Sequence, residues 1–257
     1  MIQERVDFDV IVIGGSYAGL SAAMALGRSL RNVLVIDSNS PCNHQTPHSH
    51  NFITQDGEAP LAIANKAKQQ VLNYDTVVFK NDLVVDGKEK NKGFEILTES
   101  GKTYHGKRII FATGVKDNIP NIPGFAECWG ISVIHCPYCH GYEVKNQKTG
   151  ILANGDFAYH YVQLIKKLTS DIVVFTNGKA YFTKEQWDKF ALYNIPVIEK
   201  EIENIHHQDG LLYEVQFKDN SITNLKVIYS RPLFEQHSTL PEKIGCQLTG
   251  SRSFIYR

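Results

Sequence analysis

The chain has 257 residues, 42% of them hydrophobic and 21% charged, and its 27 Lys and Arg balance 27 Asp and Glu. A chain of this length buries roughly 70 to 75% of its unfolded surface, which is enough for one large domain or two smaller ones. The balanced charge gives no electrostatic basis for binding nucleic acid or an anionic membrane surface. No stretch approaches about 18 uninterrupted apolar residues, and charged residues stand among the first positions. We therefore expect a cytoplasmic protein with no nucleic acid and no membrane as partner.

The first motif joins a buried strand to a helix through a glycine-rich turn. Residues 10–13 form an apolar run, a helix of small residues is expected over 18–30, and a second apolar strand over 33–36. A short apolar strand, a helical crossover and a second such strand indicate a parallel sheet buried on both faces. The predicted fold class is therefore α/β.

The turn itself has the features that a dinucleotide pyrophosphate requires. Gly14 and Gly19 fill the outer places of a G-x-G-x-x-G pattern, and Ser16 replaces the middle glycine. Small residues let the pyrophosphate approach the helix N-terminus, and an acid about 20 positions later accepts from the adenosine ribose. The alternative is an ordinary α/β turn without a ligand. The residues predicted to bind the cofactor here are Gly14, Ser16, Tyr17, Ala18, Gly19, Asp37 and Ser38.

A third apolar strand, 108–116, follows a predicted hairpin with a turn at Ser100 and Gly101. The segment after it, "DNIPNIPGF", contains two prolines that interrupt secondary structure. We expect a hinge between two domains at this point.

The sequence "HCPYCHGYE", residues 135–143, is compatible with several chemistries. Cys136 and Cys139 match the C-x-x-C-H of haem attachment, the C-x-x-C of a dithiol redox centre, and half of a zinc site. Haem attachment takes place outside the cytoplasm, and zinc needs two more ligands, although His135 and His140 flank the pair. Two buried cysteines without a redox role are a further alternative. In a reducing compartment a close pair is more often catalytic or metal-binding than structural.

The order of "VIGGSYAGLSAA", "VIDSN", "FATGV" and "CPYCHGYE" resembles the low-molecular-weight thioredoxin reductase family of flavoproteins. The resemblance covers most of residues 8–250, and it is closer to the branch with the dithiol oxidases of gliotoxin and holomycin synthesis. It implies FAD as cofactor, no metal, and two Rossmann-like three-layer nucleotide-binding domains, the second inserted in the first. The implied boundaries are 1–116 and 237–257 for the FAD-binding domain, and 117–236 for the inserted NAD(P)-binding-like domain that carries the cysteines.

The resemblance also implies the roles of individual residues. Cys136 and Cys139 cycle between disulfide and dithiol, with Cys139 facing the flavin and Cys136 exchanging with the substrate. Thioredoxin reductases commonly have an aspartate at the position of His140, whereas the dithiol oxidase branch shares the histidine found here. A histidine can both accept and return a proton near neutral pH, so His140 is predicted to be catalytic. Further flavin contacts are implied for His50, Asn51, Ala112, Thr113 and Gly114.

The second nucleotide-binding turn departs from its pattern. A strand over 150–153, a helix over 157–168 and a strand over 172–175 have the right order. However, Ala153 replaces the first glycine, and Asp156 puts a negative charge beside any pyrophosphate. The second strand ends without the acid of an NAD site or the arginines of an NADP site. We therefore expect NADPH binding to be weak or lost, which leaves the flavin to pass electrons to oxygen or another acceptor.

Other patterns predict core packing rather than chemistry. A capping box from Thr183 to Gln186 begins a helix whose core face is expected at Trp187, Phe190 and Ala191. Ordinary small hydrophobic roles are expected for the remaining cysteines, Cys42, Cys128 and Cys246.

The predicted function is that of an FAD-dependent, thioredoxin reductase-like dithiol/disulfide oxidoreductase acting as a dithiol oxidase. One alternative is an NADPH-dependent thioredoxin-disulfide reductase. Another is an inactive flavoprotein-like binding protein, because relatives continue through a Gly-Asp motif and a final helix that contact the flavin, whereas this sequence ends at Arg257. The expected partners are a small-molecule dithiol or a thioredoxin-like protein, and a second copy of the chain in a homodimer.

Overall fold

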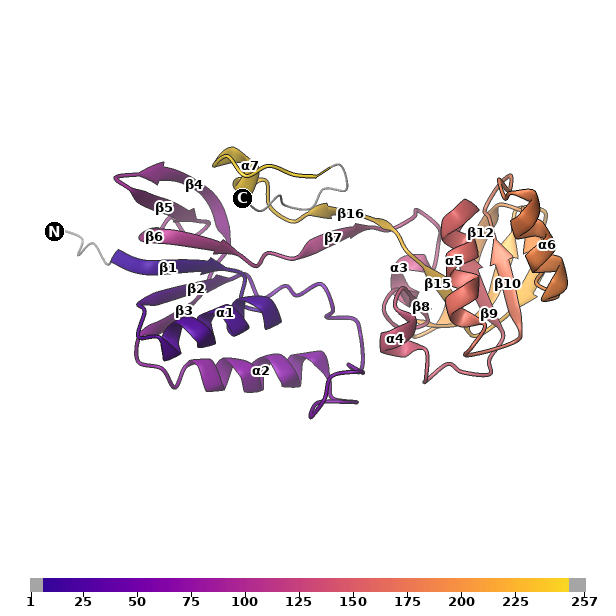
Figure 1. Cartoon of the computed structure of the whole chain (residues 1–257), viewed down its shortest axis with the longest axis horizontal. Helices are drawn as coiled ribbons and strands as arrows, with labels where there is room; N and C mark the ends of the chain where they lie inside the picture. Colours follow the sequence, from indigo (N-terminus) through magenta and orange to yellow (C-terminus); the bar gives the residue numbers. More distant parts are fainter. Residues whose placement is uncertain (1–6, 250–257) are drawn as a thin grey trace. The chain divides into compact units, whose positions relative to one another are not determined.

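The computed structural model describes residues 7–249, and contacts divide these residues into two compact units. The first unit comprises residues 7–44, 60–116 and 234–249, and the second comprises 45–59 and 117–233. The chain leaves the first unit through β7 (Val115–Asn118) and returns through β16 (Leu233–Gln236), and these two strands pair with each other (Figure 1).

The first unit is built on a six-stranded mixed sheet with the order β3-β2-β1-β6-β5-β4. Its strands are β1 (Asp7–Ile13), β2 (Val33–Asp37), β3 (Val77–Asn81), β4 (Val84–Lys90), β5 (Gly93–Thr98) and β6 (Thr103–Phe111). The first four strands in this order run parallel, whereas β4, β5 and β6 form an antiparallel meander. Parallel strands joined by helices confirm the predicted α/β class.

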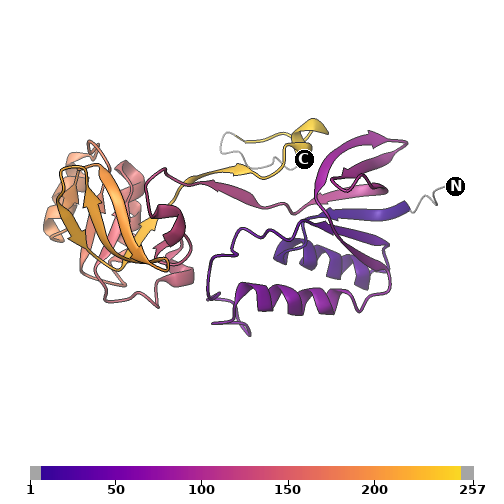
Figure 2. The ribbon, with the colours of Figure 1, turned by 180° about the vertical axis from the view of Figure 1, so that it is seen from behind.

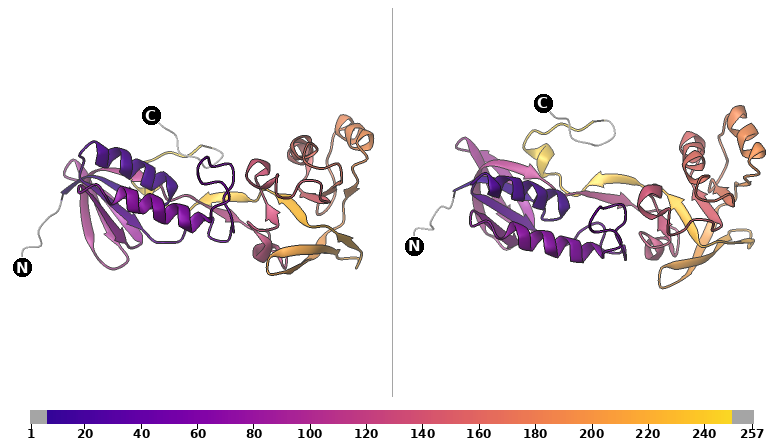
Figure 3. Two further views of the ribbon diagram at one scale, coloured as in Figure 1. Left: turned by 90° about the horizontal axis from the view of Figure 1, so that it is seen from below. Right: turned by 60° about the horizontal axis from the view of Figure 1, so that its bottom comes forward.

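Two helices cover one face of this sheet. Helices α1 (Tyr17–Arg28) and α2 (Pro60–Val71) lie side by side there (Figure 3). Successive strand residues point to opposite faces, so β1 places Val10 and Val12 in the core under the helices. Its alternate residues, Ile11 and Ile13, pack on the other face with Leu240 of α7 (Leu240–Lys243).

The second unit contains a five-stranded parallel sheet and a three-stranded antiparallel sheet. The parallel sheet has the order β11-β10-β9-β15-β8, and the antiparallel one has the order β12-β13-β14. The parallel strands are β8 (Val133–Ile134), β9 (Thr149–Leu152), β10 (Ile172–Phe175), β11 (Val197–Ile198) and β15 (Val227–Ser230). The antiparallel strands are β12 (Ile202–Gln208), β13 (Leu211–Phe217) and β14 (Ile222–Asn224).

The parallel sheet is the middle of three layers. Helices α5 (Gly155–Ile165) and α6 (Lys184–Leu192) cover one face, and the antiparallel sheet, nearest the viewer in Figure 2, covers the other. In β10 the residues Ile172 and Val174 therefore face the helices, while Val173 and Phe175 face the antiparallel sheet. Two short helices, α3 (Phe125–Cys128) and α4 (Pro137–His140), flank β8 in sequence. This unit also confirms a Rossmann-like arrangement.

The boundaries of the predicted helices shift for local reasons. The first helix ends at Arg28 instead of residue 30, because Leu30 adopts a φ of 55°, outside the helical region. Helix α5 begins at Gly155 instead of residue 157, because Asn154 is already its N-cap and accepts from the Gly155 N–H. Within residues 7–249 no helix combines the length and apolarity needed to cross a membrane.

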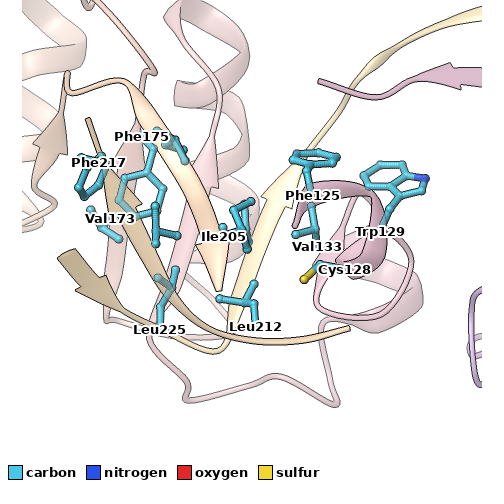
Figure 4. Packing of buried hydrophobic residues seen from close by; sticks show 13 residues of the cluster. Phe125, Cys128, Trp129, Val133, Val173, Phe175, Ile205, Leu212, Phe217 and Leu225 are labelled. Atoms are coloured by element: carbon cyan, nitrogen blue, oxygen red, sulfur yellow. The ribbon is translucent and has the colours of Figure 1, made fainter. Parts of the chain in front are cut away.

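Aliphatic and aromatic residues together form the core between the two sheets of the second unit (Figure 4). Phe175 and Phe217 are fully buried, and their ring centroids lie 5.7 Å apart in an edge-to-face arrangement. We expect Phe175→Ala to lower the free energy of unfolding of this unit by about 3 to 5 kcal/mol, because it leaves a cavity. Urea unfolding checks this against Leu192→Ala, at a position 67% exposed, which should cost less than about 0.5 kcal/mol. Equal effects of the two changes would contradict the described core.

Helix α6 confirms the predicted capping box but corrects its core face. The Thr183 hydroxyl accepts from the Gln186 N–H, and the Gln186 side chain accepts from the Thr183 N–H. Phe190 is buried as predicted, but Trp187 is 39% exposed and Ala191 is exposed. The Trp187 ring covers Phe182 and Phe190 from the solvent side.

The cysteines outside the C-x-x-C pair differ in burial. Cys128 is fully buried, as expected of a small hydrophobic residue, and burial raises the pKa of its thiol. Cys42 and Cys246 are exposed, so that expectation was wrong for both. Neither cysteine lies on an apolar helix face or strand, and only in such elements does the sequence pattern predict the burial of a side chain.

Candidate functional site

The β1–α1 turn of the first unit is held by close backbone approaches. Gly14 has a φ of 102°, a conformation that favours glycine. A β-carbon on Gly14 would collide with the carbonyl oxygen of Ala112, directly after β6. One on Gly19 would collide with the carbonyl oxygen of Gly14, so α1 begins directly against the turn. Both outer glycines of the pattern are therefore required by the geometry.

The turn presents hydrogen-bond donors and a carboxylate on its open side. Asp37, at the end of β2, accepts a 2.9 Å hydrogen bond from the Gly15 N–H through Oδ1. Ser16 is the N-cap residue of α1, yet its hydroxyl makes no capping hydrogen bond. The first N–H groups of a helix lack intrahelical acceptors and favour an anion. No acid in the first turn of α1 opposes this preference.

The remaining predicted cofactor residues of the first unit lie at the same edge of the sheet. Strands β1, β2 and β6 are parallel neighbours, so the residues that follow them meet at the carboxyl edge. The Tyr17 hydroxyl donates to the Pro60 carbonyl at 3.1 Å and so ties α1 to the start of α2. The structure thereby brings together Gly14, Ser16, Tyr17, Ala18, Gly19, Asp37, Ser38, Ala112, Thr113 and Gly114.

The cysteine pair lies at the carboxyl end of β8 in the second unit. Cys136 and Cys139 form a disulfide, with their Cα atoms 5.3 Å apart. Cys136 is the N-cap of α4, and its sulfur accepts from the Cys139 N–H at 3.2 Å. The buried Tyr161 of α5 donates its hydroxyl to the carbonyl oxygen of His135 at 2.5 Å. The first turn of α4 and the core of the unit therefore both fix the position of the pair.

An open cleft of about 360 Å³ lies beside the disulfide. We call it the redox cleft, and its lining residues are His50, Asn51, Asp56, Tyr138, Cys139, Tyr142 and Glu143. Two tyrosines on its rim, Tyr138 and Tyr142, are about 70% exposed. The cleft can hold a small polar molecule with an aromatic or apolar face.

Residues 45–59 belong to this unit, although the sequence-based boundaries placed them in the first domain. The reason is a set of contacts that no local pattern shows. Thr46 lies against Gly130. The Nδ1 atom of His50 lies 3.6 Å from Glu143 Oε1 and 3.7 Å from Asp56 Oδ1, which are ion-pair distances. His50 and Asn51, predicted as flavin residues, are thus placed beside Cys139.

His140 is partly buried directly after Cys139. Burial lowers the pKa of its imidazole, and the neighbouring His135 and His50 lower it further, whereas Glu143 acts in the opposite direction. His140 is therefore largely neutral at neutral pH and able to accept a proton.

We expect His140 to make the folded protein less stable in mild acid. The unfolded chain protonates this histidine near its ordinary pKa of about 6.5, whereas the folded protein does so only at lower pH. Below about pH 6.5 the unfolded state binds more protons, so the free energy of unfolding falls as the pH falls. Urea unfolding from about pH 7.5 to 5 should show a smaller loss for His140→Gln than for the original protein. Identical pH dependence of the two proteins would contradict a lowered pKa.

The second nucleotide-type turn, between β9 and α5, is filled by side chains of its own unit. The Asn154 amide oxygen accepts from Gly155 and Tyr181, and its amide nitrogen donates to the Lys179 carbonyl at 2.9 Å. The Tyr181 ring lies on Gly155, where a β-carbon would collide with it. Asp156 stands in the first turn and accepts from Gln186 at 2.7 Å.

Several functional candidates were not predicted from sequence. Glu143, Tyr138 and Tyr142 flank the C-x-x-C motif, so their proximity to it was a usable signal. Asp56 and Tyr181 gave no such signal, because each reaches its site through a loop. Among residues 7–249, no three His, Cys, Asp or Glu side chains converge as a metal site would require.

Known proteins resemble this chain over most of its length. A family model described as pyridine nucleotide-disulphide oxidoreductase matches residues 8–223. A probable thioredoxin reductase of Arthroderma benhamiae is 30% identical, over 93% of this chain but 66% of that protein. The thioredoxin reductase aclD of Aspergillus oryzae is 32% identical, over 83% of this chain and 71% of that protein. The crystal structure of an oxidoreductase from Agrobacterium tumefaciens matches with a TM-score of 0.91 at 34% identity, covering 98% of this chain and 85% of that one.

These matches confirm the predicted resemblance to thioredoxin reductases. The glycine cradle fits FAD, because Gly14 and Gly19 allow close backbone contacts at the start of α1 and the Asp37 carboxylate lies beside the turn. With the family model matching 216 residues, from 8 to 223, the chain belongs to the pyridine nucleotide-disulphide oxidoreductase family, whose members bind FAD.

Proposed function

We propose that the protein is a flavin-dependent dithiol oxidase in which the Cys136–Cys139 disulfide accepts two electrons from a dithiol substrate. The observation that carries the proposal is the disulfide beside an open cleft, followed directly by a partly buried histidine. Cys136 is assigned to exchange with the substrate. Cys139 is assigned as the sulfur that faces the flavin.

The chemistry is a pair of thiol-disulfide exchanges. A substrate thiolate attacks Cys136 Sγ, the enzyme Sγ–Sγ bond breaks, and Cys139 leaves as a thiolate. The second substrate thiol then attacks the substrate sulfur of the mixed disulfide, which gives the substrate disulfide and the enzyme dithiol. The Cys139 N–H, which donates to Cys136 Sγ, stabilises negative charge on that sulfur. His140 is assigned to accept a proton from a substrate thiol and to return it to a released cysteine.

The cradle of the first unit is assigned to FAD, which when bound supplies the two-electron acceptor for the enzyme dithiol. Donors from the first turn of α1, at Tyr17 and Ala18, would hold the pyrophosphate together with the Ser16 hydroxyl. Asp37 and Ser38 would hold the adenosine ribose. Flavin contacts by His50, Asn51, Ala112, Thr113 and Gly114 stay predictions.

The filled turn at α5 supports a reaction that does not use NADPH. A pyrophosphate at this helix would have to displace the Tyr181 ring and approach the Asp156 carboxylate. Separating Asn154 from Lys179 and Tyr181 would also break two hydrogen bonds. Nicotinamide binding is therefore weak or lost, and bound FAD would pass electrons to oxygen or another acceptor.

A second candidate is an NADPH-dependent thioredoxin-disulfide reductase. The names of the relatives favour it, and Gly155 and Ala158 still occupy the second and third places of the nucleotide pattern. This candidate takes a thioredoxin-like protein as substrate, whereas the oxidase takes a small-molecule dithiol.

Steady-state assays separate the two candidates. With dithiothreitol as substrate in air, the oxidase consumes oxygen and forms oxidised dithiothreitol at matching rates, and adding NADPH changes neither rate. Thioredoxin-dependent oxidation of NADPH at a comparable or higher rate would overturn the oxidase assignment.

We further propose a cytoplasmic homodimer. Three cysteines without a disulfide, two of them exposed, suit a reducing compartment. The dimer follows from the family resemblance. Light scattering of the purified protein tests it, since a monomer mass would contradict it.

A further inference from the structure

We propose that His50 is a second proton acceptor of the redox cleft, held in place by Glu143 and Asp56, so that the two thiols of the substrate each have their own histidine. This inference deepens the dithiol oxidase function proposed above and rests on it.

The position of His50 suits this role. Its ring lines the same cleft as Cys139, and its side chain is 21% exposed, which leaves it accessible to a bound molecule. The ring centroid lies 6.5 Å from that of His140, in an edge-to-face arrangement. Of these two imidazoles, His50 lines the redox cleft together with Cys139, and His140 follows Cys139 on α4.

Two carboxylates face the same nitrogen of His50. Glu143 Oε1 and Asp56 Oδ1 lie 3.6 and 3.7 Å from Nδ1. Negative charges on this side orient an Nδ1–H toward themselves and leave Nε2 as the proton acceptor. Other titratable groups near His50 are His140 and His48, and the His48 ring centroid lies 6.4 Å from that of His50. Tyr138 and Tyr142 line the same cleft.

The surrounding loop holds the ring in place. Ser49 pairs with Glu58 in an antiparallel bridge, and Asn51 adopts a φ of 59°. The Asn51 N–H donates to Asp56 Oδ1 at 2.8 Å, so the same carboxylate that faces His50 also closes the loop.

Both thiols of the substrate must lose a proton, and two histidines give each thiol its own proton acceptor. His50 takes the proton of the first thiol, whose thiolate attacks Cys136 Sγ, and Cys139 leaves as a thiolate when the Sγ–Sγ bond breaks. The neutral His140 then takes the proton of the second thiol, whose thiolate attacks the substrate sulfur of the mixed disulfide, and passes this proton to the Cys139 thiolate. Cys136 is released and receives its proton from His50. Two electrons and two protons move from the substrate to the enzyme cysteines, so no further reactant is needed.

The test is the rate at which dithiothreitol reduces the Cys136–Cys139 disulfide. Protein with and without FAD is mixed anaerobically with dithiothreitol at a series of pH values, and each reaction is quenched in acid. The free thiols are then alkylated, and mass spectrometry measures the fraction of protein in which the disulfide has been reduced. We expect His50→Ala to slow reduction at neutral pH by about 100-fold. It should also remove one of two inflections in the pH profile, and added imidazole should restore the rate. Glu143→Gln should slow reduction by about 3- to 10-fold.

His48→Gln is the matched control, since His48 is an exposed histidine of the same loop whose Nδ1 bonds to the Gly57 carbonyl. It should change the rate by less than about twofold. A His50→Ala protein with the original rate and pH profile would overturn this inference while leaving the oxidase function intact. The inference would also be overturned if His50→Ala lowered the rate equally at every pH and imidazole did not restore it. If dithiothreitol fails to reduce the disulfide of the unsubstituted protein, the proposed function itself fails.

Discussion

Replacing Cys139 by serine should reduce dithiol turnover by at least about 1,000-fold while FAD stays bound. The change removes one half of the disulfide, and without it the enzyme has no bond for a substrate thiolate to break. The cradle of the first unit contains no part of this residue, so flavin content should be unchanged. Turnover of dithiothreitol and the visible absorbance of the purified protein check the two halves of this prediction.

Cys246→Ser is the matched control for this change. Cys246 is exposed and has no disulfide partner, so its replacement should leave both turnover and flavin content at the original level. Unchanged turnover in Cys139→Ser would show that the redox centre lies elsewhere in the chain.

Replacing Gly19 by valine should weaken FAD binding by more than about 100-fold, which corresponds to about 2.7 kcal/mol. A β-carbon at this position collides with the carbonyl oxygen of Gly14, so α1 must move away from the turn. The N–H groups at the start of the helix then no longer converge on the pyrophosphate. The ratio of flavin to protein absorbance, followed by titration with FAD, measures the effect.

Ala25→Val separates lost binding from lost folding. Ala25 is an exposed residue of the same helix, and valine there should lower helix stability by less than about 1 kcal/mol without changing FAD affinity. Urea unfolding of both variants without FAD shows how much of the Gly19→Val effect is structural. Full FAD affinity in Gly19→Val would contradict the assignment of this turn as the cofactor cradle.

The first cradle could be predicted because its determinants are local in sequence. The strand, the glycine turn and the helix around Gly14 and Gly19 occur within about 30 residues, and each has a periodicity or turn requirement of its own. The C-x-x-C spacing likewise marks Cys136 and Cys139 as a close pair, but the pattern alone left their chemistry open. The structure adds that Cys136 is the N-cap of α4.

Long-range contacts could not be predicted in the same way. His50 reaches Glu143 across more than 90 positions, and Tyr181 covers Gly155 from a loop after β10. Neither loop has a periodic pattern, and the contacts depend on which strands are neighbours. The exposure of Trp187 was mispredicted for a related reason. Helical spacing gives the direction of a side chain but not how far the underlying core extends.

The most direct test of the central claim is the visible absorption spectrum of the purified protein under anaerobic conditions. It is recorded before and after addition of dithiothreitol and, in a separate sample, of NADPH. A dithiol oxidase with a filled second nucleotide turn should show flavin bands that dithiothreitol bleaches and NADPH leaves unchanged. Rapid bleaching by NADPH would contradict the loss of nicotinamide binding, and absence of flavin bands even after incubation with FAD would contradict the flavin-dependent function.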